Sequence, residues 1–174
     1  MSLSKINCGY SDEQLLIFNK KTKILLEQID IKHLDNITVI YPNQEKIAND
    51  ICDKFYNNSN LINCLVIGRA QSGKTGIMIA TIRQYVKKNI IPTDNIYIIT
   101  PLSDNDWIKQ TKDRVPECIH KNIYHRNHLS KLANEIKNKT NVLLLLDEIH
   151  IACKNNQSVN KFINDIGLNN KDEF

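Results

Sequence analysis

The strongest constraint on this chain is a short glycine-containing motif in its first half. Residues 68–75 read GRAQSGKT and match the pattern G-x-x-x-x-G-K-[ST]. The two glycines let the backbone curl so that successive N–H groups point inward, toward the oxygens of a bound phosphate. Such a motif is expected between a strand and a helix, because the N-terminal end of the helix adds positive charge.

The residues on either side of the motif fit that placement. An apolar run at 61–67 predicts a buried strand, and apolar positions from 78 to 86 predict one face of a helix. In such a loop Lys74 would neutralise the β- and γ-phosphates, and the Thr75 hydroxyl would bind Mg²⁺. We therefore predict a site for ATP and Mg²⁺ whose nucleotide-binding residues include Gly68, Gln71, Ser72, Gly73, Lys74, Thr75 and Gly76.

A pair of carboxylates follows a second apolar run. Residues 142–146 read VLLLL and predict a buried strand, and Asp147 and Glu148 come directly after it. Ligands of α/β proteins bind at the carboxyl ends of the strands. Asp147 would hold Mg²⁺ directly or through water, and Glu148 would orient and activate the attacking water. Lys74 and Glu148 are thus the predicted catalytic residues for ATP hydrolysis.

Strand-like and helix-like segments alternate along the chain. Strands are predicted at 61–67, 96–100, 122–124 and 142–146, and helices at 47–55, 78–86, 104–114, 129–136 and 159–166. This alternation predicts an α/β fold with a mainly parallel sheet and helices on both faces. We expect residues 1–40 to form a separate helical segment. Residues 41–174 are expected to form the ATP-binding domain, incomplete at its C-terminal end.

Composition places the chain among soluble, intracellular proteins. Its 174 residues suffice for one domain with a core, and no apolar run is long enough to cross a membrane. The five cysteines are scattered, which favours a reducing compartment such as the cytoplasm, including that of a virus-infected cell. A net charge of +4 permits contact with nucleic acid without requiring it.

Residues 147–150 read DEIH, which is a DExH box. Together with GRAQSGKT it resembles the first RecA-like domain of superfamily-2 helicases and translocases. The resemblance implies a RecA-like P-loop NTPase sandwich, and it implies that His150 couples the nucleotide cleft to bound nucleic acid. Residues 41–44 (YPNQ) are similar to the Gln-containing segment upstream of the loop in that family. Gln44 would then read the adenine edge, and Tyr41 would pack on the base.

The same family suggests where nucleic acid binds. Thr100 ends the predicted strand 96–100 and, with Gln110 and Arg114 downstream, resembles the motif that contacts the nucleic-acid backbone. A strand-end hydroxyl and the N–H groups of the next helix suit phosphate. Arg126 is expected on the same face. The expected partner is nucleic acid, DNA more than RNA.

A second resemblance overlaps the first. The run GRAQSGKT…IIT…DNDWIKQTKDR is similar to the "Z-one" P-loop domain of putative nucleases and helicase-like proteins of bacteria and large DNA viruses. Helicases need a second RecA-like lobe that supplies an arginine finger and the other wall of the cleft. We therefore expect a second RecA-like lobe or a partner protein. Two alternatives stay open: the ATPase motor of a DNA-packaging (terminase-like) or nuclease machine, and a non-catalytic nucleotide-binding module.

Two further features have a structural and a functional interpretation. The first is a group of potential zinc ligands: Cys118, His120, His125 and His128. Because their spacing fits no common zinc finger, we favour a loop, short strand and helix start over a zinc site. The second is Trp107, which we expect in the core rather than on a base-stacking surface.

Overall fold

The computed structural model describes residues 39–58, 63–67, 72–88, 90–100, 105–147 and 157–168. Its helices are α2 (Pro42–Asn57), α3 (Lys74–Lys87), α4 (Asn105–Lys112), α5 (Leu129–Ile136) and α6 (Ser158–Asp165). Its strands are β1 (Ile96–Thr100), β2 (Ile123–His125) and β3 (Leu143–Leu146). Short 3₁₀ helices occupy Thr93–Asn95, Glu117–Asn122 and Arg126–His128.

The strands form a three-stranded sheet in the order β2-β1-β3, and both pairings are parallel. Ile98 of β1 lies opposite Ile123 of β2 on one side and Leu145 of β3 on the other. Every residue of β1 is buried, as expected for the central strand of a parallel sheet covered on both faces. The predicted α/β class with a parallel sheet is confirmed.

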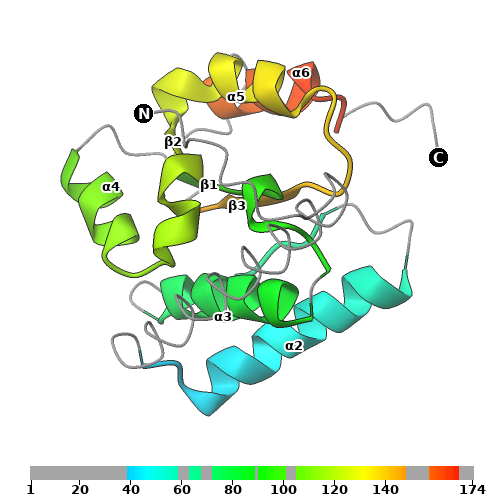
Figure 1. Cartoon of the computed structure of the whole chain (residues 1–174), viewed down its shortest axis with the longest axis vertical. Coiled ribbons are helices and arrows are strands. Elements are labelled where there is room, and N and C mark those ends of the chain that lie inside the picture. The colour runs from blue at the N-terminus through cyan, green and yellow to red at the C-terminus, as the bar shows by residue number, and fades with distance from the viewer. Residues whose placement is uncertain are drawn as a thin grey trace, which may run out of the picture.

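Helices cover the two faces of the sheet. Alternate side chains of β1 point to opposite faces, so Ile96 and Ile98 pack with α3 while Tyr97 and Ile99 pack with α5 and α6. Figure 1 shows α3 on one side of the strands, α5 and α6 together on the other, and α2 lying against α3 away from the sheet. The predicted arrangement of helices on both faces is thereby confirmed for the described residues.

The sequence explains where the helices begin and end. Pro42 occupies the first turn of α2, where its missing N–H costs no hydrogen bond. The buried residues Gln44, Ala48 and Cys52 then recur every four positions and form the face of α2 that meets α3. At the other end of the chain, Gly167 adopts a φ of 78° just after α6, the left-handed conformation that terminates many helices.

Most predicted elements occur within a few residues of their predicted bounds. The strand predicted at 61–67 is wrong for residues 63–67, the part of it that the structure describes. Residues 63–67 belong to no strand, and Leu65 and Ile67 are 70% and 86% exposed. A strand requires a neighbour that accepts its hydrogen bonds. In the described part of the chain β1, β2 and β3 pair only with one another. Residues 63–67 therefore have no neighbouring strand there, and their apolar composition alone does not make them a strand.

Some predictions fall outside the described residues. The helical segment predicted at 1–40 lies almost wholly there, and residues 39 and 40 are not helical. Asp104, the predicted start of α4, also lies outside. Within the described ranges, none of the helices combines the length and apolar character needed to span a bilayer.

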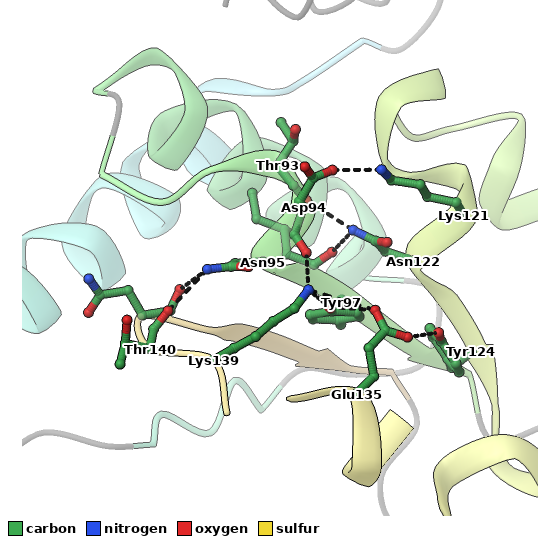
Figure 2. A network of polar contacts seen from close by, with 12 residues as sticks. Thr93, Asp94, Asn95, Tyr97, Lys121, Asn122, Tyr124, Glu135, Lys139 and Thr140 are labelled. Carbon is green, nitrogen blue, oxygen red and sulfur yellow. Dashed lines mark hydrogen bonds and ion pairs between the residues drawn. The ribbon is translucent and has the colours of Figure 1, made fainter. Parts of the chain in front are cut away.

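Polar side chains join the segments around the amino ends of the strands (Figure 2). The Asn122 side-chain amide, which is buried, donates to the carbonyl oxygens of Thr93 and Ile96, each at 3.0 Å. The Asn95 amide donates to the carbonyl oxygen of Thr140 at 3.0 Å, just before β3. These bonds connect the starts of all three strands.

A carboxylate extends this network on the α5 side of the sheet. Glu135 accepts hydrogen bonds from the hydroxyls of Tyr97 at 2.8 Å and Tyr124 at 2.5 Å, and Lys139 donates to the Asp94 carbonyl oxygen at 3.0 Å. The bond from Tyr124 is the main reason that the pKa of Glu135 is lowered. Burial, followed by the bond to Glu135, raises the pKa of Tyr124 to about 12. The carboxylate and the neutral phenol therefore stabilise each other.

Candidate nucleotide site

Helix α3 begins in the second half of the glycine motif. Gly73 is its N-cap residue and has a φ of 80°, a left-handed conformation that glycine adopts without steric cost. The Gly73 carbonyl oxygen accepts from the N–H groups of Gly76 at 2.9 Å and Ile77 at 3.3 Å, which starts the helix. The structure thus brings Ser72, Gly73, Lys74, Thr75 and Gly76 together at one helix N-terminus. Gly68 and Gln71 lie outside the described residues.

The electrostatics of this helix start suit an anion. The backbone N–H groups at a helix start point outward along the helix axis, and the helix dipole adds partial positive charge there. The first turn of α3 contains no acidic residue to offset that charge, and it contains the cationic side chain of Lys74. Ser72 is exposed, whereas Lys74 and Thr75 are half-buried. A phosphate group placed at this point would meet N–H donors, a cation and hydroxyls.

Gln44 ties α2 to the start of α3. Its Oε1 accepts from the Tyr41 backbone N–H at 2.9 Å, and its Nε2 donates to the Gly73 carbonyl oxygen at 3.0 Å. Gln44 is only 6% exposed, while Tyr41 just before α2 is exposed. The two residues of the predicted adenine pocket thus differ: Tyr41 is accessible, and Gln44 is occupied by backbone contacts.

Gly76 lies directly beneath this amide. A Cβ atom added to Gly76 would lie 2.4 Å from Gln44 Nε2, 2.6 Å from its Cδ and 2.7 Å from its Oε1. Real Cβ contacts are essentially never that short, so glycine is the residue that lets the amide lie flat on α3. The sequence contained a signal for this contact: a glycine inside a helix costs stability and indicates a close approach.

The packing of α3 orients the glycine motif toward one edge of the sheet. The apolar side chains Ile79, Ile82 and Val86 pack on the sheet face. A short connection, 88–95, leads from the end of α3 into the start of β1, so the last turn of α3 lies near the amino edge. Because the helix runs along the face, its first turn points toward the opposite edge, where the strands end.

Two predicted site residues lie at that carboxyl edge. Asp147 follows β3 directly, is half-buried, and donates its backbone N–H to the Ile99 carbonyl oxygen at 3.1 Å. Thr100 ends β1, is 2% exposed, and its hydroxyl has no hydrogen-bond partner among the described residues. Glu148 and His150 lie outside the described residues, so their predicted roles stay predictions.

The predicted nucleic-acid residues differ in their exposure. Gln110 and Arg114 are exposed and four positions apart on and just after α4, whereas Thr100 is buried and Arg126 is half-buried beyond β2. Trp107 is 36% exposed and lies three positions before Gln110, so the expectation that it belongs to the core is wrong. Gln110, one turn further along the same side of α4, is exposed as well.

The histidines of the predicted zinc group make local contacts. His120 Nε2 lies 3.1 Å from the Val115 carbonyl oxygen, and His125 Nδ1 accepts from the Asn127 backbone N–H at 3.1 Å. The rings of His125 and His128 meet edge to face with their centroids 6.3 Å apart. Within the described ranges, His, Cys, Asp and Glu nowhere gather in threes as a metal site requires.

Comparison of the chain with protein-family models, with curated proteins and with solved structures finds no match. Two groups of residues define the chemistry that the predicted site could carry out. One is the start of α3, which offers anion-binding donors and a cation. The other is the carboxyl edge of the sheet, which offers the Asp147 carboxylate and the Thr100 hydroxyl.

Proposed function

We propose that residues 41–174 form a RecA-like P-loop NTPase domain that binds ATP with Mg²⁺ and hydrolyses it. In this proposal the domain is the ATP-binding lobe of a helicase-like, nucleic-acid-dependent ATPase. One observation carries it: the second glycine of the G-x-x-x-x-G-K-[ST] motif, Gly73, is left-handed and caps a 14-residue helix that packs on a parallel sheet. This is the helix side of a phosphate-binding loop, whereas residues 63–67 before the motif form no strand.

Each residue then has a role set by its chemistry. The N–H groups at the start of α3 hold phosphate oxygens, and Lys74 neutralises the β- and γ-phosphates. The Thr75 hydroxyl and the Asp147 carboxylate are hard oxygen ligands suited to Mg²⁺. A bound Mg²⁺ would neutralise charge that develops on the phosphates during transfer. Glu148, next in sequence to Asp147, accepts a proton from the attacking water.

The nucleic-acid partner would contact the exposed side of α4. Arg114 and Gln110 offer a cation and an amide to the phosphate backbone, and the exposed Trp107 offers an aromatic face for a base. Only a few phosphate contacts are available on this surface, so binding should be weak, salt-sensitive and independent of sequence. A second lobe or partner protein would supply the remaining contacts and the arginine finger.

Calorimetric titration of Mg²⁺-ATP into the wild type and Lys74→Ala tests the proposal. Lys74 is the cation in the first turn of α3, so its loss should weaken ATP binding at least about 10-fold, or about 1.4 kcal/mol. Lys87→Ala is the matched control, because Lys87 is an exposed lysine in the last turn of the same helix. Unchanged affinity in a folded Lys74→Ala protein would rule out the phosphate-binding loop.

A further inference from the structure

The contacts of Gln44 suggest a role different from the one its resemblance implies. A glutamine that reads adenine must present its amide to the base. Here Oε1 faces the Tyr41 N–H, Nε2 faces the Gly73 carbonyl oxygen, and the flat side of the amide covers Gly76. The residue is only 6% exposed, and its amide points into the contact between α2 and α3.

The atom that Gln44 holds matters for phosphate binding. The Gly73 carbonyl belongs to the same planar peptide unit as the Lys74 N–H, and in a trans peptide the two groups point in opposite directions. Fixing the carbonyl oxygen therefore fixes the direction of that N–H. In a phosphate-binding loop, an N–H at this point of the helix start is one of the donors to phosphate.

We propose that Gln44 is a positioning residue of the phosphate loop: it orients the Gly73–Lys74 peptide and makes no contact with the base. This inference rests on the proposed nucleotide-binding function and specifies it. The part of the ligand that Gln44 acts on is the triphosphate, which all nucleoside triphosphates share. Gln44 therefore supports binding of the triphosphate whatever the base.

The test compares three ligands in the full chain: ATP, GTP and inorganic tripolyphosphate, each with Mg²⁺, titrated calorimetrically. Gln44→Met keeps the length of the side chain and removes both hydrogen bonds. Loss of the hydrogen bond to the Gly73 carbonyl oxygen should lower the affinity for all three ligands by the same factor, about 3-fold to 10-fold. Gln44→Glu keeps the acceptor for the Tyr41 N–H but sets a carboxylate against the Gly73 carbonyl oxygen, so it should weaken all three at least as much.

Gln84→Met is the matched control, since Gln84 lies on α3 about 15 Å along the helix from its first turn, and it should bind all three ligands like the wild type. Thermal unfolding of each variant verifies that the protein titrated is folded. A loss confined to ATP would overturn the inference, because that pattern identifies an adenine reader. Equal affinity of wild type and both Gln44 variants would overturn it as well.

The two proposals fail differently. If the folded wild type binds none of the three ligands, the proposed nucleotide-binding function is rejected and the positioning role with it. If the wild type binds and Gln44→Met changes the ratio of ATP to tripolyphosphate affinity, only the positioning role is rejected. A constant ratio with a uniform loss supports both.

Discussion

Replacing Gly76 with alanine should have opposite effects on stability in two backgrounds. In the wild type the new methyl carbon would overlap the Gln44 amide, because three amide atoms would lie only 2.4–2.7 Å from it. The amide is the end of a flexible side chain, so it can swing away without displacing the backbone. Doing so breaks the hydrogen bonds to the Tyr41 N–H and the Gly73 carbonyl oxygen.

The size of the effect follows from these contacts. Two intramolecular hydrogen bonds contribute about 1 kcal/mol each, so displacing the amide costs about 2 kcal/mol. Alanine inside a helix is about 0.5–1 kcal/mol more favourable than glycine. In the wild type the net change is thus a destabilisation of about 1–1.5 kcal/mol. In Gln44→Ala the overlap is gone, and Gly76→Ala should stabilise the protein by about 0.5–1 kcal/mol.

Urea denaturation of the wild type, Gln44→Ala, Gly76→Ala and the double variant measures this double-mutant cycle. The coupling between the two sites should be about 2 kcal/mol, well above the scatter expected for independent sites. The slope of each unfolding curve should stay the same, which shows that the denatured state is unchanged. If Gly76→Ala stabilises the wild type, or if its effect is equal in both backgrounds, the contact between Gln44 and Gly76 does not exist in solution.

Three further predictions address catalysis, nucleic acid and pH. Glu148→Gln should keep Mg²⁺-ATP affinity but abolish phosphate release, because the amide retains the shape of the carboxylate and cannot act as a base. Equal ATP turnover in the wild type and the variant would refute the role of Glu148 as the base, and no turnover in the wild type would favour a non-catalytic module. Arg114→Ala should weaken the binding of every single-stranded oligonucleotide by the same factor in fluorescence anisotropy, and it should reduce the slope of log affinity against log salt concentration by about 0.7. Lys161 is an exposed cation on α6, so Lys161→Ala should change neither quantity. A loss of affinity limited to certain sequences would contradict a phosphate contact of Arg114. Because the pKa of Glu135 is lowered in the folded chain, its contribution to stability is complete above its ordinary pKa of 4.5 and is lost as pH falls through the lowered value. Glu135→Gln should therefore lose less stability than the wild type between about pH 7 and about pH 3 in urea denaturation, and parallel losses would be inconsistent with the network around Tyr97 and Tyr124.

The sequence allowed most of the elements to be predicted, because their signals are local. Residues 96–100 were predicted as a strand and form β1, and the apolar period of residues 129–136 predicted α5 with its observed bounds. The strand at 122–124 was predicted one residue early, since its start depends on the preceding 3₁₀ helix, Glu117–Asn122. Local patterns therefore fix the kind of element better than its limits.

What the sequence did not reveal depends on partners far away along the chain. The apolar residues 63–67 resemble a buried strand, but burial depends on a neighbour, and Leu65 and Ile67 lie in solvent. The hydrogen bond between Gln44 and Gly73 joins residues 29 positions apart, and no local pattern reports it. Motif analysis placed both residues at the site, and the structure adds how one holds the other.

The composition of the sheet raises a question about strand alignment. β3 is four consecutive leucines, and β1 is apolar on both faces, so moving one along the other by two residues would leave nearly the same side chains in contact. Hydrophobic burial alone cannot choose between such alignments. The Asn95 amide bonds the Thr140 carbonyl oxygen just before β3, and the Asn122 amide, just before β2, bonds those of Thr93 and Ile96. The Asn122 bonds therefore favour the observed alignment of β2 with β1, and the Asn95 bond favours that of β3 with β1. That alignment sets how far each strand extends at its carboxyl end, and so where Thr100 and Asp147 lie relative to each other.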